Sequence, residues 1–136
     1  MAIKELHEIA ARVMIEGMVD LGWIEDKDPE ELLKDKAHQP FFMHGIGHHL
    51  GLDTHDSGPA ESGGEPFPMQ PGAVVTIEPG IYVSDGAEGV DPEYHGVGIR
   101  VEDDVLITHD GPDVLTGDVV KKPDDIETLM SEATPT

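Results

Sequence analysis

The sequence contains no cysteine and few basic residues. Without cysteine the chain can form neither a disulfide framework nor a thiolate metal site. Any bound metal must be held by His, Asp or Glu, a ligand set that favours Mn, Co, Zn, Fe or Mg. Eight Lys and Arg residues stand against 29 Asp and Glu residues, so the formal net charge is −21 at pH 7. This charge argues against binding to nucleic acid or to an anionic membrane, because either partner would be repelled.

The sequence also lacks an apolar run long enough to cross a membrane. Its first ten residues, MAIKELHEIA, contain no hydrophobic signal core, so we expect a cytoplasmic protein. The length of 136 residues suggests a single domain, residues 1–136. Solubility or salt adaptation is the simplest explanation of the charge.

Three helices are expected. Apolar residues recur at three- and four-residue steps over residues 2–22, which predicts an amphipathic helix that stops at Gly22. A short second helix should start at Pro29 with Asp28 as its N-cap. The segment KPDDIETLMSEA predicts a third helix with Pro123 near its start.

The strands are expected between two loops and the last helix. Glycine and proline are dense within residues 53–73, which predicts a long loop. The run AVVTIEPGIYV predicts a strand, a kink at Pro79-Gly80 and a second strand. After a loop at DGAEGVDPEYH, the run GVGIRVEDDVLIT predicts a strand with a turn near Asp103-Asp104, and GPDVLTG a hairpin-like connection. The order indicates an α+β fold with an antiparallel β-sheet covered by helices.

Four of the eight histidines lie within FFMHGIGHHLGLDTHDSG. Of these, His44, His48 and His55 are interleaved with glycine and leucine, an arrangement that a solvated loop would not require. Metal ligation and catalysis are the two chemical interpretations of such a cluster, and a histidine-rich turn is the third.

Two carboxylates and one guanidinium occur where a strand normally carries apolar residues. Glu78 lies within VVTIEPG, and Arg100 and Glu102 lie within GIRVEDDV. A buried carboxylate must be paired, hydrogen-bonded or metal-bound to offset its desolvation. Arg100 and Glu102 are two residues apart, so both should point to one face of the strand. Together with the histidines, the two glutamates match the hard-ligand shell of a metal-dependent hydrolase.

Each of these residues also has a structural interpretation. A single strand glutamate pairs with Lys or Arg more often than with a metal. His7, His38 and His109 receive no role, and His49 and His95 are more consistent with structural histidines than with ligands. Only the combination of the segments favours a metal site.

The segments resemble a known family. HGIGHHLGLDTHD, MQPGAVVTIEPGIYV and GVGIRVEDDVLIT are similar to three consecutive motifs of the aminopeptidase P and prolidase group of metallopeptidases, and the tail VVKKPDDIETLM is also similar. The resemblance implies the pita-bread fold, which that group shares with creatinase and methionine aminopeptidase.

The resemblance also implies roles for six residues. His48, Glu78 and Glu102 match metal ligands, and Glu102 matches the glutamate that bridges two metals. His44 and His55 match histidines that contact the substrate, and Arg100 matches an arginine that supports the site. In such enzymes the metal ions, most often Mn²⁺ with Zn or Co as alternatives, lower the pKa of a bound water and polarise the substrate carbonyl.

The family pattern includes two aspartate ligands on a hairpin that would precede residue 2, and the printed sequence does not contain it. The chain therefore resembles the C-terminal half of a pita-bread catalytic domain. Asp53, Asp56 and Asp103 cannot be assumed to replace the two aspartates. Such a half would expose an apolar sheet face and an open edge, so we expect a homodimer in which a second copy covers them.

Three functions remain open. The first is a hydrolase with a reduced metal site that acts on activated esters or phosphotriesters, which need less help from an acid than Xaa-Pro peptides do. The second is an inactive or structural metal-binding fragment. The third is a peptidase that requires a separate N-terminal half. For either of the two active forms, the substrate would be a small molecule or a short peptide.

Overall fold

The computed structural model describes residues 1–59 and 61–132. The helices are α1 (Ile3–Asp20), α2 (Pro29–Lys34) and α3 (Pro123–Glu132), with a 3-10 turn η1 (Pro92–Tyr94). The strands are β1 (Glu61–Ser62), β2 (Glu65–Pro66), β3 (Val74–Ile77), β4 (Gly80–Tyr82), β5 (Gly98–Arg100), β6 (Asp103–Thr108) and β7 (Gly111–Val114). Every strand pair is antiparallel, which confirms the predicted α+β fold.

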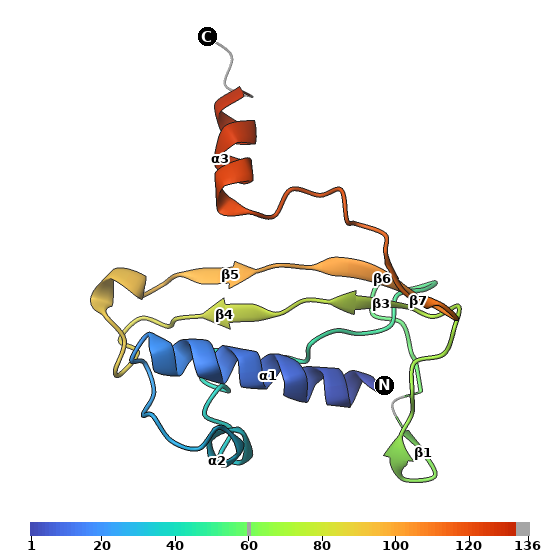
Figure 1. The fold of residues 1–136 in the computed structure, drawn as a ribbon, viewed down its shortest axis with the longest axis horizontal. Helices are drawn as coiled ribbons and strands as arrows, with labels where there is room; N and C mark the ends of the chain where they lie inside the picture. Colours follow the sequence, from blue (N-terminus) through green and yellow to red (C-terminus); the bar gives the residue numbers. More distant parts are fainter. Residues whose placement is uncertain (60, 133–136) are drawn as a thin grey trace.

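Two long chain segments form the central part of the sheet. One runs through β3 and β4 and the other through β5 and β6, and Figure 1 shows them side by side, with α1 along one side. β3 pairs with β6, β4 pairs with β5, and β7 adds to β6. The pairing is interrupted at Glu78-Pro79, one residue before the predicted break at Pro79-Gly80, because proline has no N–H for the ladder while Gly80 already pairs within β4.

The turn predicted near Asp103-Asp104 is wrong. Asp103 and Asp104 belong to β6 and pair with Ile77 and Thr76, and the break lies one step earlier, at residues 101–102. The two aspartates can lie within a strand because the Thr116 hydroxyl provides a hydrogen-bond partner for each of them. Its hydroxyl donates to Asp103 Oδ1 over 2.6 Å and accepts from the Asp104 N–H over 3.0 Å.

Helix α1 is two residues shorter at its C-terminal end than predicted, and it buries the expected stripe of Ala11, Met14, Ile15 and Met18. It ends as the sequence indicates. Gly22 adopts a φ of 71°, and the Trp23 N–H donates to the Met18 carbonyl over 2.9 Å, the pattern of a glycine-terminated helix. At α2 the Asp28 side chain accepts from the N–H groups of Glu30 and Glu31, so the predicted N-cap is confirmed.

The core lies between α1 and the β3–β4 segment. Its buried members are Met14, Met18, Phe41, Phe42, Ile46, Val83 and Val90. Phe42 and Ile46 flank His44 in the sequence, so the histidine-rich segment is anchored to the core on both sides. The long loop predicted for residues 53–73 contains the small β1–β2 hairpin, whose strands have two residues each.

The predicted open edge is present. No described strand pairs with the outer side of β5. Next to this edge, Ile99 is 63% exposed, and Val97 and Val101 are exposed as well. Helix α3 lies on the β5 side of the sheet, opposite α1, in Figure 1, and its residues Pro123, Ile126 and Glu127 line a shallow pocket together with residues 99–102. Within the described part of the chain, no helix is both long and apolar enough to span a bilayer.

Candidate functional site

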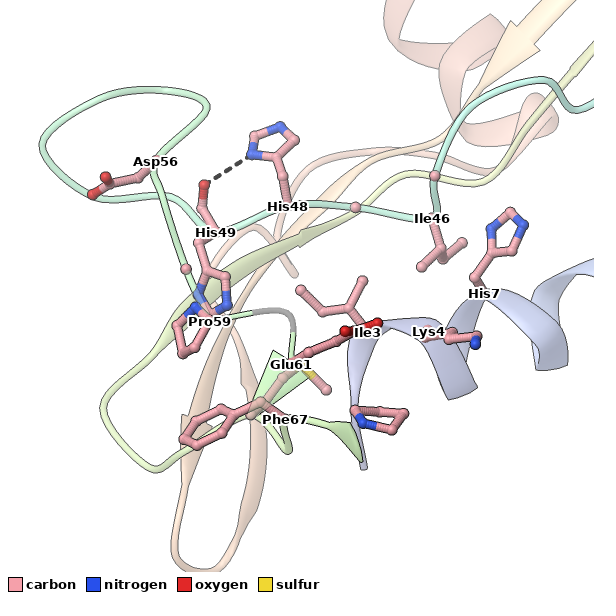
Figure 2. Close-up of a pocket in the computed structure, with 15 residues that line it drawn as sticks. Ile3, Lys4, His7, Ile46, His48, His49, Asp56, Pro59, Glu61 and Phe67 are labelled. Carbon is pink, nitrogen blue, oxygen red and sulfur yellow. Dashed lines mark hydrogen bonds between the residues drawn. The ribbon is translucent and has the colours of Figure 1, made fainter. Parts of the chain in front are cut away.

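His48 is placed by a strand-like segment that runs beside β3. The Thr76 N–H donates to the His48 carbonyl over 2.9 Å, and the Glu78 N–H donates to the Ile46 carbonyl over 2.7 Å. Gly47 permits this close approach, because a Cβ at that position would lie 1.8 Å from the Thr76 carbonyl oxygen. In an extended segment neighbouring side chains alternate, and Figure 2 shows the rings of His48 and His49 on opposite sides.

The tautomer of the neutral His48 ring is set by its backbone contact. Its Nδ1 lies 2.9 Å from the His49 carbonyl oxygen, which can only accept, so Nδ1 carries the proton in the neutral ring. The opposite nitrogen, Nε2, lies 3.3 Å from Glu78 Oε1. In the neutral ring, two electron-rich atoms therefore face each other without a proton between them. A cation next to both would relieve this repulsion, as would protonation of His48.

Glu78 is the more buried of the two site glutamates, with a side chain 12% exposed. Thr76 orients it by donating its hydroxyl to Glu78 Oε1 over 3.0 Å, and the same hydroxyl accepts from the His48 N–H over 3.0 Å. One buried threonine thus connects the two proposed ligands. The sequence reasoning missed Thr76, although it is the polar residue within VVTI and lies two residues before Glu78, on the same face.

Arg100 lies between the two glutamates. Its Nε is 3.8 Å from Glu78 Oε2 and 3.6 Å from Glu102 Oε2, so the predicted proximity of Arg100 and Glu102 is found. The prediction that Glu102 is buried is wrong, since its side chain is 42% exposed. Glu102 lies in the break after the edge strand β5, where no described strand covers it.

The two remaining site histidines lie on either side of His48 in the sequence. His55 is exposed, and its ring centroid is 4.4 Å from that of His48. His44 Nε2 lies 2.9 Å from the Tyr82 hydroxyl, and its Nδ1 lies 2.7 Å from the Gly45 carbonyl oxygen. The structure therefore brings His55 to His48 and ties His44 to β4. Tyr82 is a second residue that the sequence reasoning missed, and nothing in its position marked it.

The donor set suits a hard or borderline divalent ion, although it is incomplete in this chain. Two tetrahedral ligands of one ion at usual Zn–N and Zn–O lengths are about 3.3–3.5 Å apart, which the His48–Glu78 separation of 3.3 Å matches. Among residues 1–59 and 61–132, however, no three His, Asp or Glu side chains are grouped closely enough to hold a metal ion. Two ligands thus fit one ion, and the rest of its shell is not assembled by the described residues.

The other candidates have structural partners. Asp56 Oδ2 accepts from the Leu52 N–H, and Asp103 forms a 3.0 Å ion pair with Lys121. The Thr116 hydroxyl and the Lys121 ammonium together hold the pKa of Asp103 below its usual value. His95 Nδ1 accepts from the Gly86 N–H over 3.2 Å. These contacts agree with the sequence interpretation, which gave none of these residues a ligand role.

A cavity of about 430 Å³ lies on the far side of the His48 segment. In Figure 2, Ile3 and Lys4 approach it from α1, Phe67 closes it below, and the His49 ring lies beside Pro59. A Cβ at Gly58 would overlap the His49 ring, so His49 is packed into this wall. Its structural interpretation therefore fits the geometry.

Comparison with known proteins identifies the family. Residues 1–109 match metallopeptidase family M24. The chain is 46% identical over 132 residues to the Xaa-Pro aminopeptidase of Escherichia coli (strain K12) and 41% identical over 130 residues to that of Haemophilus influenzae. These alignments cover 97% and 96% of this chain and 29% and 30% of the relatives, so the chain spans about 30% of their length.

Solved structures agree. Proline aminopeptidase P II from Yersinia pestis superposes with a TM-score of 0.88 at 47% identity, over 97% of this chain and 30% of that one. Zinc-substituted E. coli aminopeptidase P in complex with product gives a TM-score of 0.90 at 45% identity, over 100% of this chain and 30% of that one. The architecture is thus part of the pita-bread fold of these enzymes, and the chain belongs to metallopeptidase family M24.

Proposed function

We propose that this chain forms the C-terminal share of a metal-dependent peptidase site, which hydrolyses Xaa-Pro peptides once further ligands complete it. The observation that carries the proposal is the pairing of His48 Nε2 with Glu78 Oε1 at 3.3 Å, with the His48 proton held on the far nitrogen. Xaa-Pro aminopeptidase is the activity for which the similar E. coli and H. influenzae proteins are named.

In this proposal His48, Glu78 and Glu102 hold divalent metal, with Mn preferred and Zn or Co as alternatives. The metal supplies a water of lowered pKa and polarises the substrate carbonyl. Thr76 fixes the Glu78 carboxylate. Arg100 balances the charge of both glutamates, which would otherwise repel each other. His55, next to His48 and open to solvent, is suited to contact the substrate together with His44.

A second candidate is hydrolysis of activated esters or phosphotriesters by this chain alone. It is favoured by the exposure of Glu102 and Arg100, which leaves the site open to small substrates. Such substrates have good leaving groups, so they depend less on the acid and the positioning that a complete cleft provides. A third outcome, structural metal binding without hydrolysis, uses the same ligands.

Metal binding is the first prediction. The full 136-residue chain, freed of metal by a chelator, is titrated with MnCl₂ and with ZnCl₂ in a calorimeter. His48→Ala and Glu78→Gln should each weaken binding at least about tenfold, because each removes a direct ligand. His49→Gln is the matched control and should bind as the parent does, since its ring lies on the opposite side of the segment. Equal affinity in all four proteins would refute the assigned ligands.

Activity separates the candidates. The chain is assayed with metal on a chromogenic phosphotriester, and on an Xaa-Pro peptide with and without a separately expressed N-terminal half of a family M24 catalytic domain. Peptide cleavage only with the added half supports the principal proposal. Phosphotriester turnover by the chain alone, lost in His48→Ala, supports the second candidate. Metal binding without turnover in any of these assays would refute both hydrolytic candidates and support structural metal binding.

For the partner, we propose that the isolated chain forms a homodimer through the open β5 edge. Ile99, Val97 and Val101 lie exposed beside this edge, and an unpaired strand edge next to apolar side chains favours self-association. Light scattering at micromolar concentration should give twice the mass of one chain. The Ile99→Lys substitution should lower the measured mass toward that of the monomer. A monomeric parent chain would rule the dimer out.

A further inference from the structure

We propose that Tyr82 is a positioning residue for His44, holding its ring in one orientation and one tautomer. The Tyr82 hydroxyl lies 2.9 Å from His44 Nε2, and the two residues come from segments 38 positions apart in the sequence. The proposed hydrolysis assigns no role to Tyr82. Through this contact Tyr82 acts on the site by way of His44.

The hydrogen-bond directions follow from the partners. The Gly45 carbonyl oxygen, 2.7 Å from His44 Nδ1, can only accept, so Nδ1 donates and carries the proton. In the neutral ring Nε2 is then bare and accepts from the Tyr82 hydroxyl. Tyr82 is thus the donor that occupies the free nitrogen. Without it, this nitrogen would lose its protein partner and the ring one of its two hydrogen-bonded ends.

The Tyr82 ring lies in a slot formed by two glycines. Gly98 is its partner across the β4–β5 pair, and Gly80 lies two residues earlier on β4. A Cβ at Gly80 would come within 2.6 Å of the Tyr82 hydroxyl oxygen, and a Cβ at Gly98 within 2.9 Å of Tyr82 Cδ1. The ring can therefore occupy this position only because both residues lack a side chain. At the backbone, the Tyr82 N–H donates to the Phe41 carbonyl over 2.9 Å.

The His44 ring also packs against the ring of Phe42. The ring of Phe42, which is buried, meets the His44 ring edge-on with centroids 4.9 Å apart. Together, the Gly45 carbonyl, the Phe42 ring and the Tyr82 hydroxyl constrain the imidazole from three directions. The catalytic consequence, a His44 presented to substrate in a defined state, rests on the proposed function. The constraint on the ring does not, and it can be measured without substrate.

The experiment is nitrogen-15 NMR of the histidine rings in the full chain, at a pH where His44 is neutral. In the parent, His44 should show a protonated Nδ1 and an Nε2 resonance shifted by hydrogen-bond acceptance. Tyr82→Phe should move the Nε2 resonance toward the value of an unbonded imidazole nitrogen, with little change in thermal stability. Tyr94→Phe is the matched control, because it removes the hydroxyl of the only other tyrosine. An unchanged His44 spectrum in Tyr82→Phe would overturn the proposal.

Gly98→Ala provides a second test that retains the hydroxyl. The added Cβ should displace the Tyr82 ring and move the His44 Nε2 resonance in the same direction as Tyr82→Phe. A resonance that stays at the parent value in a folded Gly98→Ala protein would contradict the slot. Where turnover is observed, Tyr82→Phe should lower kcat about tenfold with little change in KM. No turnover by the parent even with the added N-terminal half, with the spectral changes present, would refute the proposed function and leave the positioning role intact.

Discussion

At the scale of residues, the histidine-rich segment is organised by its glycines and by backbone carbonyls. Gly47 lets the segment approach β3, and the carbonyls of Gly45 and His49 each accept a hydrogen bond from Nδ1 of the preceding histidine. Both His44 and His48 consequently turn an unprotonated Nε2 away from their own backbone. Two neighbouring histidines, His48 and His49, therefore differ in environment because they alternate across an extended segment.

Gly47 gives a prediction at this scale. Gly47→Ala should destabilise the chain by about 2–3 kcal/mol, because its Cβ would collide with the Thr76 carbonyl and the backbone would have to move. Urea denaturation measures the change. Gly17→Ala is the control, since Gly17 lies exposed in α1 and an added Cβ there would meet nothing within 4 Å, and it should stabilise by about 0.5–1 kcal/mol. Equal effects of the two substitutions would contradict the close-approach argument.

At the scale of elements, α1 and the turn after α2 meet through two histidines. The His7 and His38 ring centroids are 5.8 Å apart, both rings contact Phe42, and His38 is only 5% exposed. Burial lowers the pKa of both histidines below the usual value, and their Nδ1 atoms have no hydrogen-bond partner among the described residues. Both rings are therefore neutral in the folded chain near neutral pH, so the junction between α1 and α2 is sensitive to acid.

The pH dependence of stability follows from the sign of these shifts. The unfolded chain, with ordinary histidine pKa values near 6.5, binds more protons than the folded chain once the pH falls below that value. The contribution of the two histidines to the free energy of unfolding should be largest above about pH 7. It should decrease as the pH falls through 6.5 toward the lowered pKa values of the histidines in the folded chain. Urea denaturation between pH 5.5 and 8 measures this.

The contribution of His38 can be isolated. His38→Leu should flatten the decrease by up to about 1.4 kcal/mol per pH unit, because one titrating group is removed. His109→Gln, in an exposed turn, should leave the slope as in the parent. A parent stability that does not change across this pH range would show that the two buried rings do not govern the junction.

At the scale of the whole molecule, charge opposes compactness. The net charge of −21 is distributed over a chain with only eight Lys and Arg residues, and Arg100 is engaged with the two site glutamates. Self-repulsion of this size destabilises the folded state and is screened by salt. The same field concentrates cations near the surface, which favours metal uptake at the His48–Glu78 pair.

Salt should therefore stabilise the chain. With chelator present, the thermal unfolding midpoint should rise as NaCl increases from 0.05 to 0.5 M, and most of the rise should come at the low end because the screening length shortens fastest there. Circular dichroism melts at constant pH measure the midpoint. A midpoint that falls or stays level over this range would show that self-repulsion is not a significant cost in this fold.

The sequence by itself determined the helices, the kink at Pro79, the caps at Asp28 and Gly22 and the family, because periodicity, turn chemistry and motif letters are local properties. It misplaced the turn near Asp103 and the burial of Glu102, which depend on Thr116 and on the edge of β5 that no described strand covers. Only the tertiary structure decided that Thr76 joins His48 to Glu78 and that Tyr82 reaches His44. The His48–Thr76 and Tyr82–His44 contacts join residues 28 and 38 positions apart, and their distances are set by packing between segments that a local pattern does not contain.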